Sequence, residues 1–346
     1  MSKRLGMAMV SLAWPVVIVA AVIAILAGTA GNKYELALLS TACINIMVLA
    51  GLNLIAGFGG QLALGQAAFV GTGAYATMIA VLDLGWSPVA ALVVSPLISA
   101  AFALLIGLPS LRLRGLYFAV ATLAFGVIFS QLVLQGGTLT GGPDGRGGIP
   151  PLNLFGIAFN RPLVELMLVA VIAMVALLLV RGLSRTWFGW GLRASRVSEP
   201  GASGVGVSIF RTRLVAFVLS GVLGGLGGSL LAFEHQYVSP SSFTFFASID
   251  LFMVLFLGGL GTFLGPVVGA AILYAFARWF TAFPDAQPFI LGAVFLLALR
   301  FFPLGIGGYV ESRWQRWRTH RRALPDRPDD AVPADDGLVR EGSVSR

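Results

Sequence analysis

Long runs of apolar residues, separated by short polar or basic segments, make up most of this chain. An α-helix needs about 20 predominantly apolar residues to cross the hydrocarbon core of a bilayer. The pattern therefore predicts an all-α, polytopic membrane protein with about ten transmembrane helices. The predicted spans are 9–30, 36–57, 62–82, 88–108, 116–134, 163–180, 214–233, 249–257, 266–280 and 289–302. The span at 249–257 is short, and we expect its helix to begin in the preceding Phe-rich run at 243–246.

One stretch differs from an ordinary membrane helix. Positions 57–76 read GFGGQLALGQAAFVGTGAYA, with six glycines and two glutamines between two apolar runs. Glycine allows close backbone approach and non-helical torsions, and a glutamine at membrane depth must face protein or water. Gln61, Gly65 and Ala68 recur at helical spacing, so one smooth face is expected there. Two interpretations stay open: a tight turn before a closely packed helix, or a broken segment that lines a substrate path.

The polar side chains on and before this stretch are the candidates for the substrate path. They are Asn45, Asn53, Gln61, Gln66 and Thr72. Some of them are expected only to form interhelical hydrogen bonds, which contribute about 0.6 kcal/mol each in membranes. Close helix packing is expected at Gly59, Gly60, Gly65 and Gly71. The pattern GxxxxLG at 59–65 recurs at 259–265, either as an internal repeat or as a coincidence in a Gly-rich chain.

Composition and charge support the membrane interpretation. The chain is 57% hydrophobic and 11% charged, whereas soluble domains carry about 25% charged residues. The net charge of +8 arises from arginines in short loops, which is unlike a nucleic-acid-binding face. Because the loops at 112–114 and 181–213 are the Arg-rich ones, the positive-inside rule predicts cytoplasmic N- and C-termini. We expect a membrane domain over 1–310 and a disordered cytoplasmic tail over 311–346, where charged residues and prolines alternate.

The chain lacks the chemistry of an enzyme. Neither of its two lysines follows a glycine as in a phosphate-binding loop, so ATP would have to be hydrolysed by another polypeptide. His235 and His320 lie far apart, and Cys43 is the lone cysteine, so we expect neither a metal site nor a disulfide. We therefore expect no catalytic residue and no bound cofactor. Carboxylates fall at the ends of predicted spans, which argues against a proton relay: Glu35, Glu165 and Asp250.

Four segments, in the same order, resemble the LivM-type permease subunit of branched-chain amino-acid ABC transporters. They are the stretch at 57–76, LRLRGLYFAVATLAFG at 111–126, LTGGPDG at 139–145 and LGGLGTFLGPVVGA at 257–270. The resemblance covers roughly 36–303. The chain departs from the family pattern at Ala63 and Gln66, where serine and histidine are usual, and in the loop RASRVSEPG at 193–201. Pro200 in that loop is expected to shorten any helix beyond it.

This resemblance implies one of two membrane subunits of an ATP-driven importer in the bacterial plasma (inner) membrane. The implied partners are a second permease subunit, two cytoplasmic ATPase subunits and an extracytoplasmic substrate-binding protein. The implied cargo is a branched-chain or related amino acid. The resemblance also implies that ATP-driven closure is transmitted through the loop at 181–213. Within it we expect the coupling surface at Arg193, Ser195, Arg196 and Glu199; the alternative is that these arginines only fix the topology. A stand-alone channel or facilitator for a small neutral solute, such as urea, is the alternative, and the sequence leaves the substrate and stoichiometry open.

Overall fold

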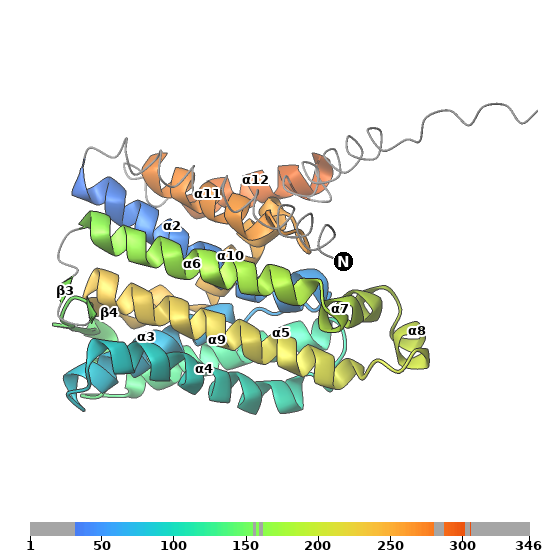
Figure 1. Ribbon diagram of the computed structural model, residues 1–346, viewed down its shortest axis with the longest axis horizontal. Helices are drawn as coiled ribbons and strands as arrows, with labels where there is room; N and C mark the ends of the chain where they lie inside the picture. Colours follow the sequence, from blue (N-terminus) through green and yellow to red (C-terminus); the bar gives the residue numbers. More distant parts are fainter. Residues whose placement is uncertain (1–31, 155–156, 159–161, 280–286, 302–304, 306–346) are drawn as a thin grey trace, which may run out of the picture. The chain divides into compact units, whose positions relative to one another are not determined.

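The computed structural model describes residues 32–154, 157–158, 162–279, 287–301 and 305. The predicted first span at 9–30 and the predicted tail at 311–346 lie outside the described residues. The described helices run side by side as a bundle (Figure 1). Helices α7 and α8 lie at one end of this bundle, and the short strands β3 and β4 lie at the other. We refer to these as the α7 end and the β4 end.

The helices follow the predicted spans from the second one onward. The long elements are α2 (Lys33–Leu52), which continues into the π-helix η1 (Asn53–Phe58), then α3 (Gln66–Leu82), α4 (Pro88–Ser110), α5 (Leu116–Gln135), α6 (Pro162–Ser184), α9 (Ile209–His235), α10 (Phe245–Gly258), α11 (Gly265–Trp279) and α12 (Gln287–Phe301). The short helices are η2 (Gly142–Asp144), α7 (Trp187–Val197), α8 (Glu199–Gly204) and η3 (Pro240–Phe243). Two antiparallel strand pairs complete the fold: β1 (Arg146–Gly147) with β4 (Tyr237–Val238), and β2 (Asn153–Leu154) with β3 (Ile157–Ala158).

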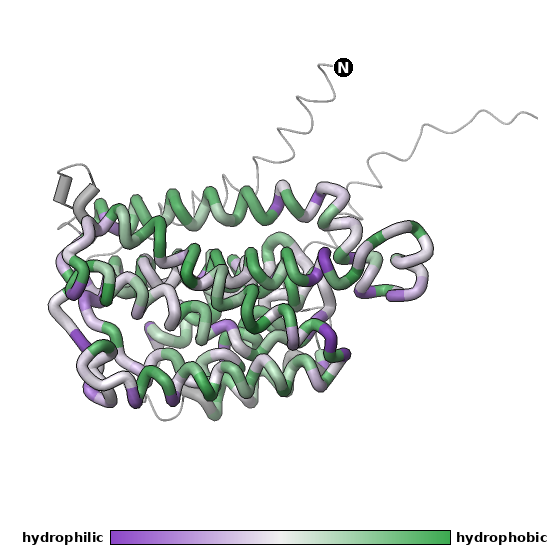
Figure 2. The backbone as a smooth tube through the Cα atoms, turned by 90° about the horizontal axis from the view of Figure 1, so that it is seen from below, coloured by the Kyte–Doolittle hydropathy of each residue, from purple (hydrophilic) through white to green (hydrophobic). Residues whose placement is uncertain are grey.

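Within the described residues, five helical segments are long and apolar enough to cross a membrane: α2 with η1, α4, α5, α6 and α9. Hydrophobic positions dominate the middle of the bundle, and hydrophilic ones gather toward its ends (Figure 2). The most apolar windows of α4, α5 and α6 are only 33% buried, which suits helices whose outer faces meet lipid. The prediction of an all-α membrane protein is confirmed, and the count of ten spans stays a prediction.

Helix α9 packs against α2, α3 and α4, and small residues allow the close approach. A Cβ atom at Gly228 would collide with the carbonyl oxygen of Val70 on α3, and one at Gly225 would collide with Ser99 on α4. Gly227 faces α2 in the same way. Apolar helices gain no hydrophobic advantage by leaving lipid, so close packing through small residues is a main source of their association.

A buried cluster of hydroxyl groups joins three of these helices. The Thr77 Oγ1 atom on α3 lies 2.7 Å from Ser95 Oγ on α4 and 2.7 Å from Ser229 Oγ on α9. The Ser99 hydroxyl also donates to the carbonyl oxygen of Phe69 at 3.0 Å. Because the hydrocarbon core offers no other partners, these hydrogen bonds fix how α3, α4 and α9 are rotated against one another.

The break before α3 corrects one sequence expectation. Residues 59–65 are not helical, and α3 begins at Gln66 rather than at position 62. Gly60 has a φ of 66°, a left-handed conformation that ends the preceding π-helix at little steric cost. Gln61 and Gly65 therefore do not share a helical face with Ala68.

Two further expectations are corrected in the second half of the chain. Helix α10 begins at Phe245, as the Phe-rich run predicted, so Asp250 lies within the helix and not at its end. Pro200 lies in the first turn of α8, where a backbone N–H has no intrahelical partner in any case. The proline therefore starts that helix instead of shortening it.

Candidate functional site

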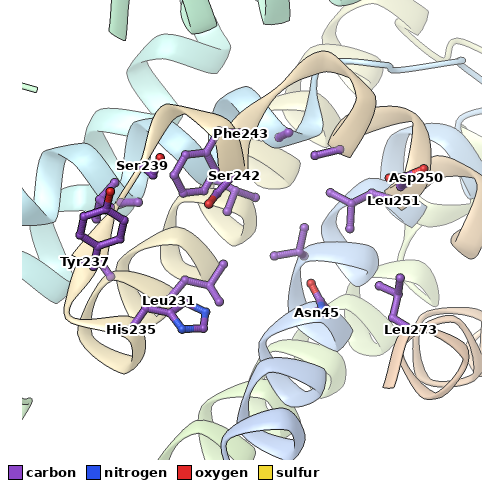
Figure 3. Close-up of a pocket in the computed structure, with 17 residues that line it drawn as sticks. Asn45, Leu231, His235, Tyr237, Ser239, Ser242, Phe243, Asp250, Leu251 and Leu273 are labelled. Carbon is purple, nitrogen blue, oxygen red and sulfur yellow. The ribbon is translucent and has the colours of Figure 1, made fainter. Parts of the chain in front are cut away.

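A cavity of about 230 Å³ lies among α2, α3, α9, α10 and α11. Its walls are mostly apolar. The polar side chains that line it are Asn45, His235, Tyr237, Ser239, Ser242 and Asp250. Figure 3 shows His235 and Tyr237 on one side of the cavity and Asp250 with Leu273 on the other. Because His235 and β4 lie where α9 ends, the cavity extends from the β4 end toward the middle of the bundle.

The Gly-rich stretch contributes one apolar wall of this cavity. Ala67, Val70 and Ala74 on α3 all line it, at spacings that place them on one helical face. Their small side chains leave the space open. The glycines of the same stretch serve contacts elsewhere: a Cβ atom at Gly71 would collide with the Phe129 ring, and one at Gly65 would lie 2.8 Å from the carbonyl oxygen of Thr122.

Of the five side chains proposed from the sequence for the substrate path, Asn45 lines the cavity. Asn53 instead bridges to the turn before α11. Its Nδ2 donates to the Thr262 carbonyl oxygen at 2.8 Å, and its Oδ1 accepts from the Gly261 N–H at 2.8 Å. These contacts hold the end of α2 against that turn, and the role of Asn53 in transport stays a prediction.

The other three lie in packed surroundings. The Gln66 Nε2 is 3.3 Å from the carbonyl oxygens of both Val48 and Ser220, and its Oε1 accepts from Ser220 Oγ at 2.9 Å. Thr72 donates to the Ala68 carbonyl oxygen one turn earlier in α3, and Gln61 is buried in the non-helical segment. Gln66, the first residue of α3, thus ties this helix to α2 and α9. These contacts lie between the cavity and the α7 end.

Two Gly-rich turns and one arginine meet at the α7 end. We call this contact region the glycine junction, comprising residues 53–60, residues 259–262 and Arg196. The Arg196 Nη1 donates to the Gly57 carbonyl oxygen at 2.5 Å. A Cβ atom at Gly60 would lie 2.6 Å from the Arg196 side chain, and one at Gly261 would lie 2.9 Å from its Nη1. Because both positions are glycine, there is room for the Arg196 side chain between them. The two GxxxxLG segments, at 59–65 and 259–265, therefore meet around this arginine.

The remaining residues of the proposed coupling surface connect α7 and α8 to their neighbours. The Arg193 guanidinium lies 4.9 Å from the centre of the Phe58 ring at the end of η1. Ser195 is buried, and its hydroxyl donates to the Leu192 carbonyl oxygen. Glu199 accepts from Arg213 Nη1 at 2.8 Å, which ties α8 to α9, and a weaker ion pair at 3.8 Å joins it to Arg114.

Gly59, the remaining glycine for which close packing was predicted, caps the C-terminal end of η1.

At the β4 end, the loop with the LTGGPDG motif is fastened beside the cavity mouth. Strand β1 in this loop pairs with β4, whose Tyr237 and Val238 line the cavity. The Tyr237 hydroxyl also donates to the Asp144 carbonyl oxygen. Arg146 forms a bidentate ion pair with Asp83 after α3, at 2.6 and 2.8 Å. Hydrogen bonding by this guanidinium lowers the pKa of the Asp83 carboxyl group below its ordinary value.

Residues 33–299 match the family described as "Branched-chain amino acid transport system / permease component". The chain belongs to this permease family. It is 32% identical over 286 residues to the high-affinity branched-chain amino acid transport system permease protein LivM of both Salmonella typhimurium and Escherichia coli, covering 76% of this chain and 67% of each relative. A probable branched-chain amino acid transport permease protein LivH of Methanocaldococcus jannaschii is 26% identical over 209 residues, covering 57% of this chain and 64% of the relative. No solved structure matches the chain.

Membership of the permease family agrees with the expectation that the chain is not an enzyme. The matched region runs from the start of α2 into α12, so it includes both the cavity and the glycine junction. Sequence reasoning missed the polar side of the cavity that α9, β4 and α10 supply. The signal was available in the short polar segment QYVSPSS at 236–242, which interrupts two apolar runs.

Proposed function

We propose that this chain is one membrane subunit of an ATP-driven importer that moves a branched-chain or related amino acid into the cytoplasm. The cavity carries the proposal. Its volume of about 230 Å³ is below the ~300–1,000 Å³ typical of sites for drug-sized ligands. Apolar walls with a few polar groups suit one small molecule that has an apolar side chain and charged ends. The family names of its relatives point to the same cargo.

The arginines support the orientation of this subunit. The α7 end carries Arg112 and Arg114 between α4 and α5, and Arg185 and Arg211 beside α7 and α8. The positive-inside rule then makes the α7 end cytoplasmic, in a multi-pass protein of the plasma (inner) membrane. In this orientation the cavity opens outward and the glycine junction lies between it and the cytoplasm. We infer that this arrangement represents the outward-facing state of an alternating-access cycle.

Helices α7 and α8 are suited to contact the ATPase subunits. Trp187 and Val197 on α7 are 73% and 87% exposed, and Trp190 is exposed beside them. Large exposed apolar side chains at the end of a helix bundle mark either a partner surface or a membrane interface. Arg196 on the same helix holds the Gly57 carbonyl oxygen. A shift of α7 caused by ATPase closure would therefore pull directly on the glycine junction, which separates the cavity from the cytoplasm.

Reconstitution in proteoliposomes tests this function. The chain is combined with its second permease subunit and two ATPase subunits, and uptake of radiolabelled leucine is measured with and without ATP inside and binding protein outside. Uptake that requires both ATP and the binding protein supports the importer. Uptake of leucine or urea down its gradient, in the absence of ATP and binding protein, would establish the facilitator instead.

A further inference from the structure

Asp250 is a carboxylate inside α10 on the wall of the cavity. Its side chain is partly buried among apolar neighbours that include Leu251 and Leu273 (Figure 3). The ion pairs found among the described residues engage other carboxylates, namely Glu35, Asp83 and Glu199. Within the described part of the chain, Asp250 is therefore a cavity carboxylate with no fixed cationic partner.

An ionised carboxylate at membrane depth is tolerated when it faces a water-filled cavity or a cation. The described residues that line this cavity include no lysine or arginine. Among the described residues that line the cavity, His235 is the one with a basic side chain. It lies across the cavity from Asp250 (Figure 3). A cation among the contents of the cavity would complement the charge of Asp250 there.

The composition of the site favours an ammonium group over a metal ion. Within the described residues, no group of three or more His, Cys, Asp and Glu side chains could hold a metal, and hard cations usually require several oxygen ligands. An alkylammonium needs fewer partners, since it is a compact charge with three N–H donors. Asn45, on α2, lines the same cavity and supplies an amide group as a further hydrogen-bonding partner.

We propose that Asp250 receives the ammonium group of the transported amino acid, an inference that rests on the proposed function. In this arrangement the apolar wall formed by Val48, Val70 and Leu273 accommodates the substrate's side chain. The hydroxyl group of Ser242 is a neutral donor suited to the substrate's carboxylate. The site thus distinguishes the two charged ends of an amino acid and admits it in one orientation.

Cysteine protection tests this inference without requiring transport. A single cysteine replaces Ala247, which lines the cavity one turn before Asp250, in a Cys43→Ala background. The assembled complex, without ATP or binding protein, is treated with a small neutral thiol reagent. The probes are isopentylamine, which is leucine without its carboxylate, 4-methylpentanoate, which lacks the amine, and the uncharged 3-methylbutan-1-ol. We expect isopentylamine alone to slow labelling.

The Asp250→Asn variant should need about tenfold more isopentylamine for the same protection, because one charge-assisted contact is lost. Asp250→Glu should retain protection, which separates a charge effect from misfolding. Glu165→Gln, which removes a half-buried carboxylate of α6 outside the cavity, is the matched control and should behave as wild type. Equal protection by the amine and the alcohol, or full amine protection in Asp250→Asn, would overturn the inference.

Failure of this inference is distinguishable from failure of the proposed function. If leucine uptake driven by ATP is intact while Asp250→Asn changes neither uptake nor amine protection, the importer stands and the role of Asp250 is wrong. If isopentylamine protection depends on Asp250 but no ATP-driven uptake occurs with a full set of partners, the ammonium site stands and the importer proposal fails.

Discussion

Replacing Asn53 by alanine should destabilise the protein, although Asn53 looks from the sequence like a residue of the transport path. The Asn53 side chain is 1% exposed and makes two hydrogen bonds of 2.8 Å with Gly261 and Thr262. Truncation removes both bonds and leaves a backbone N–H and a carbonyl oxygen without these partners. The end of α2 is then no longer tied to the turn before α11.

The expected loss of stability follows from these two contacts. Interhelical hydrogen bonds in membranes contribute about 0.6 kcal/mol on average and up to ~1.7 kcal/mol. An orphaned buried polar group costs about 1–3 kcal/mol. Two average bonds give a lower limit of about 1.2 kcal/mol, and two of the strongest give about 3.4 kcal/mol, so the free energy of unfolding should fall by roughly 1–3 kcal/mol. The cost of leaving a buried polar group without its partner lies in the same range.

Cys43 provides the assay. It is the only cysteine of the chain, and it is buried in α2, so a fluorogenic maleimide reacts with it only when the helices separate. Thermal unfolding of the purified protein in detergent then gives a midpoint for each variant. Asn53→Ala should unfold several degrees below wild type. Asn45→Ala is the matched control, because Asn45 faces the cavity, where water can replace its amide.

A midpoint for Asn53→Ala that equals that of wild type would refute the reasoning, because the two hydrogen bonds would then contribute nothing to stability. An equally large loss in Asn45→Ala would also refute it, since the distinction between a bonded and a cavity-facing asparagine would have no energetic meaning.

Three further predictions concern other parts of the bundle. Gly228→Ala should destabilise the protein by about 1–3 kcal/mol through overpacking against α3, in the same thermal assay, because its Cβ atom would collide with a backbone carbonyl oxygen. Arg196→Ala should leave membrane insertion intact but allow ATP hydrolysis without matching leucine uptake, because α7 then loses its hydrogen bond to the Gly57 carbonyl oxygen of η1. The measurement is the ratio of uptake to hydrolysis in the reconstituted complex. At neutral pH the Asp83 ion pair should hold β1 in place. The protection factor for hydrogen exchange at residues 146–147, which is the intrinsic rate divided by the observed rate at the same pH, should fall as the pH falls through the lowered pKa of Asp83.

Each of these predictions has a control. Gly182→Ala on α6 has no atom within 4 Å of the new methyl group and should leave the midpoint unchanged. Arg185→Ala removes an arginine from the same end of the bundle, so uncoupling in that variant as well would show a general effect of charge. Asp83→Asn should show a low protection factor at residues 146–147 even at neutral pH, and a protection factor that still falls with acid in this variant would point to another titrating group.

The sequence by itself determined the class of the protein and most of its helices. Hydropathy over about 20 residues is a local property, so α4, α5, α6 and α9 are found close to their predicted bounds. The phenylalanine run likewise predicted the start of α10. The order of the four motifs was sufficient to identify the permease family, because each motif matches the family's sequence whatever the packing of the helices.

Only the tertiary structure decided which polar groups are available to a ligand. Asn45 and Asn53 lie two turns apart and look equivalent in sequence, yet one faces the cavity and the other binds the turn before α11. The sequence placed Asp250 at the end of an apolar run, and only the arrangement of α10 with α2, α3, α9 and α11 showed that its side chain lines a cavity. The physical reason is that a helix has several faces, and its neighbours, which lie up to about 200 residues away in sequence, determine which face meets protein and which meets open space.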